Sequence, residues 1–284
     1  MTSIGSDSVR SEVTGTGPHP WRVALAWASL SDVGLRREVN EDSVVTALPV
    51  FAVADGMGGH AAGDVASRVV VTRLGDLARD TTSDPAHVYE QLRLAVEDMV
   101  TETAITDGNT GTTLTGIVLG EAEGRPTWFC VNIGDSRVYL LENGTLRQIT
   151  EDHSVVQHLI NQGAISPAEA EDHPHANVIT RAVGPGDDPY PDVFVVPVAS
   201  GQRFLICSDG LTKELTDLGI AHFLASGQSP AEAAETLLRE SLGNSGRDNI
   251  TVAVVDVLEV SAGEDGGAED AGDSDTAPIS GTAR

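Results

Sequence analysis

The sequence predicts an α+β fold, a four-layer α/β/β/α sandwich in which two mostly antiparallel sheets carry helices on their outer faces. Short apolar runs rich in β-branched residues end abruptly in Asp-Gly or a similar turn, which is typical of strands. The segments with helical periodicity are grouped between blocks of strands, whereas a parallel sheet would alternate strand and helix regularly.

The expected strands and helices follow one another from about residue 21 to residue 260. Asn143-Gly144 predicts a hairpin turn inside one of the strand regions. Ser229 is a suitable helix N-cap, with Pro230 at the first helical position. Two short helices are expected around Gly163. The other expected elements are strands within 23–34, 43–56, 110–120, 127–144, 192–198, 202–210 and 248–260, and helices within 60–80, 86–105 and 229–242.

Composition divides the chain into one folded domain and two flanking segments. Residues 1–20 are small and polar without periodicity, and we interpret them as a disordered lead-in. No Pro/Gly/Ser-rich linker interrupts the apolar runs between 21 and 260, which favours a single domain. Residues 261–284 are acidic and rich in Gly and Ala, and we interpret them as a disordered tail.

The chain is strongly acidic, with 43 Asp and Glu residues against 17 Lys and Arg residues and a formal net charge of −26. Such a field repels phosphate backbones and anionic lipids, which argues against nucleic-acid and membrane partners. No apolar stretch approaches the roughly 20 residues of a membrane span. No apolar secretory core is found near the N-terminus, so we expect a cytoplasmic protein. Cys130 and Cys207 lie in apolar runs and are expected to be buried free thiols.

Four aspartates stand at the ends of expected strands. Asp55 follows the run FAVA, Asp135 follows VNIG, Asp209 follows FLICS, and Asp248 opens NITVAVV. Each alone could be an ordinary turn residue. Strand tips of one sandwich can converge, however, and converging carboxylates repel one another unless a cation neutralises them. Lys213 is the only lysine in the chain, and hard oxygen ligands favour Mg²⁺ or Mn²⁺ over Zn²⁺.

Six short motifs occur in a fixed order along residues 25–257. They are Arg37-Glu38-Val39-Asn40-Glu41-Asp42, Ala54-Asp55-Gly56-Met57-Gly58-Gly59, Gly111-Thr112-Thr113, Asn132-Ile133-Gly134-Asp135-Ser136-Arg137, Ser208-Asp209-Gly210-Leu211 and Asp248-Asn249-Ile250-Thr251. In this order they resemble the metal-dependent protein phosphatases of type 2C, in their bacterial form. The resemblance implies hydrolysis of phosphoserine and phosphothreonine on proteins by direct attack of a metal-bridging hydroxide, without a phosphoenzyme.

The resemblance also implies two or three divalent cations, Mn²⁺ or Mg²⁺, held by particular residues. Asp55 would bridge two ions, and Gly56 would bind one of them through its backbone carbonyl. Asp209 and Asp248 would complete this ligand set. Asp135, together with Asp209, would hold a weaker third ion.

Three further residues would act on water or substrate. Glu41 would bind a metal through water, and Asp42 would orient such a water for catalysis. Arg37 would bind the phosphate dianion bidentately, because its planar guanidinium fork matches phosphate geometry. Two ions about 3.5–4 Å apart can lower the pKa of a bridging water towards neutrality.

One position departs from many eukaryotic members of the family. Met57 replaces a histidine that is thought to protonate the leaving alkoxide, so the general acid is open. Metal-bound water is the first candidate and His153 the second. Residues 151–187 would form the family's flap beside the active site. Its irregularly spaced histidines are expected to be surface residues, and the segment could gate substrate access.

Three functions stay open from the sequence alone. The first is a phosphatase that counteracts Ser/Thr protein kinases, with phosphorylated proteins, either kinases or their substrates, as its partners. The second is a catalytically silent binding module, disfavoured because every matched aspartate is present. The third is a hydrolase of small phosphorylated metabolites on the same metal centre. A monomer is expected.

Overall fold

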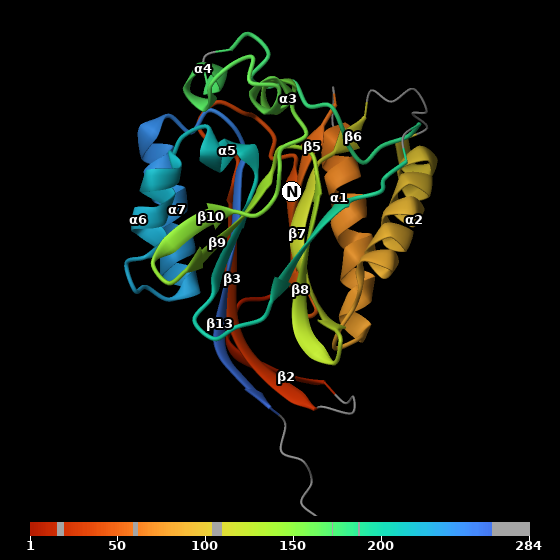
Figure 1. Cartoon of the computed structure of the whole chain (residues 1–284). Helices are drawn as coiled ribbons and strands as arrows, with labels where there is room; N and C mark the ends of the chain where they lie inside the picture. Colours follow the sequence, from red (N-terminus) through yellow and green to blue (C-terminus); the bar gives the residue numbers. More distant parts are fainter. Residues whose placement is uncertain (16–19, 59–61, 104–109, 172, 187, 263–284) are drawn as a thin grey trace, which may run out of the picture.

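A computed structural model of the chain describes residues 1–15, 20–58, 62–103, 110–171, 173–186 and 188–262. It contains two facing sheets with helices on both outer sides (Figure 1). The expected α+β sandwich is therefore confirmed. Most of the expected acidic tail, residues 263–284, lies outside the described residues.

The first sheet has the strand order β1-β4-β5-β7-β8-β11, with β6 paired to β5. Only β1 and β4 run parallel among the strand pairs described for this sheet; its other pairs are antiparallel. Its strands are β1 (Thr2–Gly5), β4 (Asp42–Ala47), β5 (Val50–Met57), β6 (Gly111–Thr112), β7 (Leu114–Ala122), β8 (Arg125–Ile133) and β11 (Asp192–Pro197).

The second sheet has the order β10-β9-β12-β13-β3-β2 and is antiparallel throughout its described pairs. Asn143 and Gly144, with φ of 51° and 76°, form the predicted hairpin turn between β9 and β10. The strands are β2 (Ser8–Gly15), β3 (Trp21–Asp32), β9 (Arg137–Glu142), β10 (Thr145–Gln148), β12 (Arg203–Cys207) and β13 (Ile250–Ala262).

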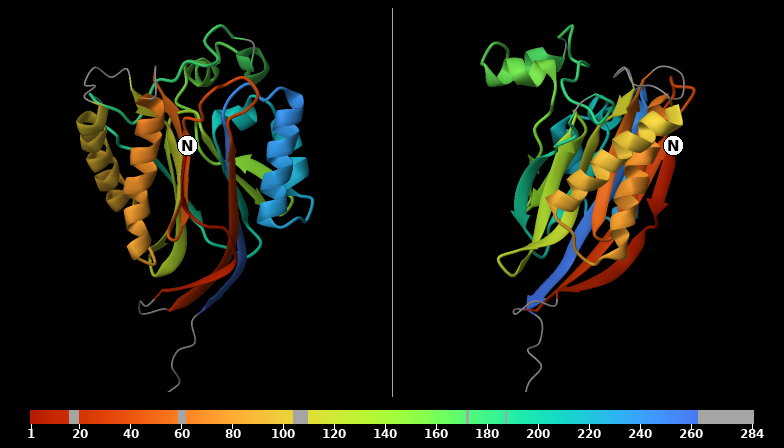
Figure 2. Two further views of the ribbon diagram at one scale, coloured as in Figure 1. Left: turned by 180° about the vertical axis from the view of Figure 1, so that it is seen from behind. Right: turned by 90° about the vertical axis from the view of Figure 1, so that its right-hand side faces the viewer.

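Helices cover the outer face of each sheet, as the left view of Figure 2 shows. On the first sheet lie α1 (Ala62–Gly75), the 3₁₀ turn η1 (Asp76–Arg79) and α2 (Pro85–Thr103). On the second lie α5 (Asp209–Thr212), α6 (Asp217–Leu224) and α7 (Pro230–Asn244). Ser229 caps α7 in a full capping box with Glu232, as its sequence predicts.

The core lies in three layers that match this arrangement. Between the sheets, Phe51 and Trp128 are fully buried with edge-to-face ring contacts, their centroids 6.2 Å apart. Two further apolar clusters fill the spaces between each sheet and its helices. Cys130 and Cys207 are buried free thiols, as expected, and burial raises the pKa of each to about 12. Among the described residues no helix is long and apolar enough to cross a membrane.

The expected disordered lead-in is wrong, because residues 1–20 contain β1 and β2. The polar composition of this segment gave no strand signal, because both strands are held mainly by backbone pairing with β4 and β3. Strand β13 likewise runs past residue 260 to Ala262. The single strand region expected within 43–56 is a hairpin, because β4 and β5 pair antiparallel across a short turn that contains Leu48 and Pro49. The short helix α6 was not predicted.

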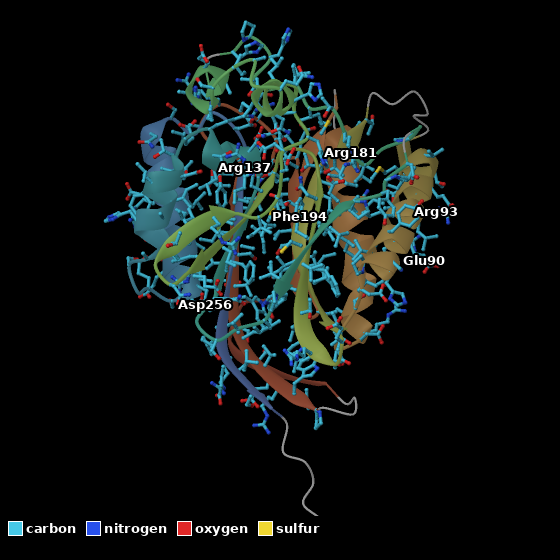
Figure 3. All side chains as sticks on the ribbon, in the orientation of Figure 1. Glu90, Arg93, Arg137, Arg181, Phe194 and Asp256 are labelled. Atoms are coloured by element: carbon cyan, nitrogen blue, oxygen red, sulfur yellow. The ribbon has the colours of Figure 1, made fainter. Side chains whose placement is uncertain are left out.

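The described residues 151–171 and 173–186 lie at one end of the sandwich and carry the two short helices expected there, α3 (Val155–Asn161) and α4 (Pro167–Glu171), drawn at the top of Figure 1. Arg137 in β9 anchors the beginning of this segment through Asp152, with Nη2 2.7 Å from Oδ2. Figure 3 places Arg137 and Arg181 at this end of the sheets, below the two helices.

Candidate metal centre

An acidic pocket of about 300 Å³ is lined by residues near strand ends of both sheets and by Asn177 and Ile179. The structure therefore brings together the aspartates that the sequence places at separate strand tips. The lining residues are Arg37, Glu41, Asp55, Gly56, Met57, Gly58, Thr113, Asp135, Asn177, Ile179, Asp209, Lys213, Asp248 and Asn249.

Asp55 ends the buried part of β5, and its backbone is fixed by the Gly111-Thr112-Thr113 motif. Its amide donates to Thr113 Oγ1 at 3.0 Å, and its carbonyl accepts from the Thr113 amide at 2.9 Å. Thr112 Oγ1 donates to the same carbonyl at 2.9 Å. The motif therefore holds the Asp55 carboxylate at the pocket rim without contacting that carboxylate.

Asp42 lies opposite Asp55 in the β4–β5 pair but is fully buried behind the pocket wall. Its Oδ2 accepts hydrogen bonds from Ser208 Oγ at 2.8 Å and from Thr251 Oγ1 at 2.6 Å. Its Oδ1 is buried without a protein partner. A buried carboxylate oxygen without a donor is costly unless water or a cation reaches it.

Asp209 and Asp248 reach the pocket from the second sheet, and Lys213 stands between them. Lys213 Nζ lies 2.5 Å from Asp209 Oδ2 and 2.8 Å from Asp248 Oδ2. Arg37 also binds Asp248, with Nε 2.8 Å from Oδ1 and Nη2 3.1 Å from Oδ2. Asp209 Oδ1 is buried and has no protein partner.

The loop that carries Arg37 and Glu41 is held by Asn249. Its side-chain oxygen accepts from the Glu41 amide at 2.8 Å, and its Nδ2 donates to the carbonyls of Val33 and Val39, each at 3.0 Å. The Asp-Asn motif therefore fixes Asp248 and the Arg37 loop together.

The electrostatics of the pocket follow from burial and mutual repulsion. Burial raises the pKa of Asp42 to about 7; Asp209 and Asp248 add to the rise, while hydrogen bonds from Thr251 and Ser208 oppose it. Burial also raises the pKa of Asp135 to about 7, with Asp209 adding to it. Burial, reinforced by the charges of Asp42 and Asp209, raises the pKa of Asp55 well above its usual range.

Asp248 behaves differently from its neighbours. Burial acts to raise its pKa, but the hydrogen bonds and charges of Lys213 and Arg37 outweigh burial and hold that pKa below its usual range. The carboxylates of Asp42, Asp55 and Asp135 have no comparable cation of the chain among their described contacts, so the pocket carries more negative charge than its side chains can neutralise.

The residues fit hard divalent cations in their chemistry. The available donors are carboxylate and carbonyl oxygens, two of the buried carboxylate oxygens have no partner, and the charge is in excess. Gly56 lies where a Cβ would come within 2.2 Å of the Gly63 carbonyl oxygen, so the chain passes too closely here for a side chain. As the side chains stand, no three Asp, Glu, His or Cys residues of the described chain share one point. On one side of the pocket the ammonium of Lys213 lies between Asp209 and Asp248.

His153, the second candidate for the general acid, does not line the pocket. Its Nδ1 accepts from the Gly134 amide at 3.0 Å, so its other nitrogen, Nε2, faces Asp192 Oδ2 at 3.1 Å as a donor. Arg181 Nη1 completes the cluster, 2.6 Å from Asp192 Oδ1. His153 thus connects the start of the segment 151–171 to Gly134, the residue before Asp135.

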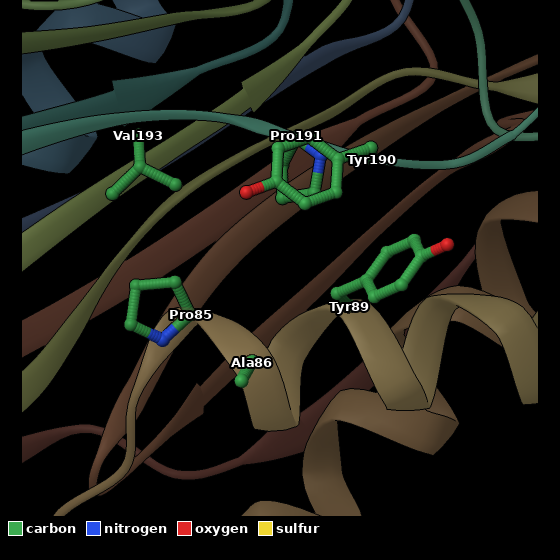
Figure 4. Close-up of a pocket in the computed structure, with 6 residues that line it drawn as sticks. All are labelled: Pro85, Ala86, Tyr89, Tyr190, Pro191 and Val193. Atoms are coloured by element: carbon green, nitrogen blue, oxygen red, sulfur yellow. The ribbon is translucent and has the colours of Figure 1, made fainter.

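A second hollow of about 300 Å³ lies between the start of α2 and the segment before β11 (Figure 4). It is lined by Pro85, Ala86, Tyr89, Tyr190, Pro191 and Val193, and Tyr89 and Tyr190 meet edge to face with centroids 5.2 Å apart. Because this lining has no carboxylate and no cationic side chain, the hollow offers nothing for phosphate chemistry.

Sequence reasoning missed Lys213, Thr113 and Asn249 as parts of the site. Lys213 carried a usable signal, since it follows Asp209 by four residues and such pairs share one face of a helix. Thr113 and Asn249 lie in two of the motifs found in the sequence, but their contacts with the backbone of Asp55 and Glu41 could not be predicted, because these contacts join strands that are distant in sequence.

The fold and the pocket together define a class of protein, a four-layer α/β/β/α sandwich with an acidic, oxygen-only centre where its two sheets meet. The family model for protein phosphatase 2C matches residues 36–244. The serine/threonine phosphatase Stp of Listeria welshimeri is 37% identical over 225 residues, which cover 76% of this chain and 88% of that protein. The chain belongs to the protein phosphatase 2C family, as its motifs predict.

Solved structures give the same assignment. The Mycobacterium tuberculosis serine/threonine phosphatase PstP superposes with a TM-score of 0.76 at 38% identity, over 84% of this chain and all of that crystallised chain. A second structure of the PstP catalytic domain, in complex with two manganese ions, gives a TM-score of 0.73. In sequence, the match spans 47% of full-length PstP and 85% of this chain.

Proposed function

We propose that this protein, a serine/threonine phosphatase of the protein phosphatase 2C family, hydrolyses phosphoserine and phosphothreonine on proteins at the acidic pocket, with two or three Mn²⁺ or Mg²⁺ ions. One observation carries the proposal: Asp55, Asp135, Asp209 and Asp248 line a single pocket that has excess negative charge. The two manganese ions bound by the PstP catalytic domain support the choice of ion.

Within the proposal, Asp55, Asp209 and Asp248 are the direct ligands and the Gly56 carbonyl contributes a fourth oxygen. When bound, the ions would neutralise these carboxylates and lower the pKa of water enough for it to attack phosphorus directly, without a phosphoenzyme. Asp135 and Asp209 would together hold a third ion. This assignment is supported by their shared lining position and by the repulsion between them.

Glu41 and Asp42 hold water in this scheme. Glu41 is partly buried at the rim, and burial raises the pKa of its carboxyl. Asp42 keeps one oxygen fixed by Ser208 and Thr251, so its free Oδ1 has a defined direction for a water or ion-bound ligand. Its position behind Asp55 supports an orienting role and not direct contact with substrate.

Arg37 is the proposed phosphate clamp. It lines the pocket, its side chain is 52% exposed, and it already makes a bidentate contact with a carboxylate, Asp248. A phosphate dianion offers the same geometry as that carboxylate. With Met57 at the rim and His153 turned away from it, proton donation to the leaving alkoxide falls to water in the site.

The physiological setting is part of the proposal. We place the enzyme in the cytoplasm as a monomer that acts on phosphorylated proteins and opposes Ser/Thr protein kinases. Support comes from the relatives, which are named Ser/Thr phosphatases, and from the net charge of −26, which disfavours nucleic acid as a partner.

Turnover of a phosphothreonine peptide with Mn²⁺, compared with the same reaction in EDTA, tests the proposal. We expect hydrolysis with Mn²⁺ and none in EDTA. No hydrolysis in either condition would instead support a silent binding module. Faster turnover of small phosphorylated metabolites than of phosphopeptides would replace the protein substrate with a metabolite.

A further inference from the structure

Lys213 holds a position that the proposed chemistry does not use. It is the only lysine in the chain, and its ammonium bridges two of the proposed metal ligands, Asp209 at 2.5 Å and Asp248 at 2.8 Å. A cation of the protein therefore stands where cations from solution are proposed to bind.

The local backbone structure fixes Lys213 beside Asp209. Lys213 closes the four-residue helix α5, its amide bonding to the Asp209 carbonyl at 2.8 Å, so the two side chains lie one turn apart on one face. Its carbonyl accepts from Arg247 Nη2 at 2.8 Å. The backbone is thus fixed on both sides, and only the flexible four-carbon side chain has freedom to move.

The Lys213 side chain also has open space into which it can move. It is 29% exposed and lines the open pocket, so the ammonium can swing into solvent without disturbing the core. Asp248 would keep its second partner, Arg37, at 2.8 Å, whereas Asp209 has no other cation among its described contacts.

We propose that Lys213 is an internal counter-ion of the metal-free site, which competes with the divalent cation and sets the affinity for it. This inference rests on the proposed metal-dependent function. Asp209 and Asp248 would hold either the ammonium of Lys213 or a divalent cation, so binding of the cation would require the ammonium to move away from both carboxylates. The apparent affinity for the ion is then the intrinsic affinity multiplied by the fraction of metal-free molecules in which Lys213 has left the site.

The competition gives Lys213→Met two opposite effects. The metal-free protein should be less stable, because Asp209 loses the one cation among its described contacts. The same variant should bind Mn²⁺ about tenfold more tightly, because a repelling unit charge near the ion is removed. A purely structural lysine would weaken both properties, so the opposite signs separate the two roles.

The test uses the full-length protein freed of metal with EDTA and dialysed. Thermal unfolding in EDTA measures the stability of the metal-free state, and isothermal titration with Mn²⁺ measures affinity and stoichiometry. Arg239→Met is the matched control, since it removes one positive charge from the exposed face of α7, where its partner is Glu240. We expect the control to resemble wild type in both measurements.

A direct readout follows from the single lysine. Labelling with an amine-reactive reagent, followed by mass spectrometry of the Lys213 peptide, should be slow in EDTA and faster with Mn²⁺. A Lys213→Met protein that binds Mn²⁺ no more tightly than wild type would overturn this inference. The same holds if the labelling rate of Lys213 does not change with Mn²⁺. Neither result would contradict the proposed function. If neither wild type nor Lys213→Met binds Mn²⁺, both fall. Binding only by the variant supports strong competition.

Discussion

Replacing Asp42 with Asn should stabilise the metal-free protein at pH 8, although it removes a residue of the site. Asp42 is fully buried, and its pKa rises from an ordinary value of 3.8 to about 7. Because the folded state holds its proton more tightly than the unfolded state, the charged form costs stability above pH 7. Three pKa units correspond to about 4 kcal/mol.

Part of that gain is offset. Ser208 and Thr251 donate to the carboxylate, and an amide oxygen replaces it as a weaker acceptor, at a cost of about 1 kcal/mol for each bond. The net stabilisation is about 2 kcal/mol, or roughly 4–8 °C in Tm for a domain of this size. The folded state binds more protons than the unfolded state between about pH 4 and pH 7. The advantage of Asp42→Asn therefore shrinks as pH falls through 7 and disappears near pH 5.

The assay is thermal unfolding of wild type and Asp42→Asn in EDTA at pH 5, 6, 7 and 8. Asp80→Asn, which removes an exposed carboxylate, should change Tm little at any of these pH values. Saturating Mn²⁺ should reverse the order at pH 8, since the ion binds the charged wild-type site. An Asp42→Asn protein that is less stable than wild type at pH 8 in EDTA, or a difference independent of pH, would refute the reasoning.

Three further substitutions test other parts of the site. Asp209→Ala should lower Mn²⁺-dependent hydrolysis by tens to thousands-fold with an unchanged circular dichroism spectrum; more than about a tenth of the wild-type rate would argue against its ligand role. Arg37→Ala should chiefly raise KM for a phosphopeptide, and an unchanged KM would exclude the phosphate clamp. Gly210→Ala should destabilise the fold by about 1–3 kcal/mol, because the new Cβ would lie 1.9 Å from the Asn249 carbonyl oxygen; chemical denaturation with a wild-type midpoint would contradict this.

Much of the fold was predictable because its signals are local. Strands such as β5 and β12 are apolar runs that are followed or ended by an aspartate. The start of α7 is predicted by Ser229 as N-cap and Pro230 as the first helical residue. The strands β1 and β2 were missed because most of their side chains are exposed or half-buried and their stability comes from pairing with β4 and β3. A strand held by its neighbour's backbone leaves little trace in its own sequence.

The candidate site also has features that the sequence predicts and features that it does not. That Asp55, Asp209 and Asp248 would meet was predictable from strand-tip positions and motif order, and all three line one pocket. That Asp42 would be buried behind Asp55, or that Lys213 would bridge two carboxylates, depends on side-chain directions that follow only from the packed sheets. The sequence therefore indicated which carboxylates come together, whereas the packing of the two sheets determines which of these carboxylates are exposed to solvent.

The central claim is that carboxylates from separate strands jointly bind divalent cations. Calorimetric titration of the metal-free, full-length protein with Mn²⁺, for wild type and Asp55→Asn in parallel, tests it most directly. We predict at least two ions per chain for wild type and fewer for Asp55→Asn at the same pH. Wild-type protein that takes up no Mn²⁺, or an Asp55→Asn protein that binds the same number of ions with the same affinity, would contradict it.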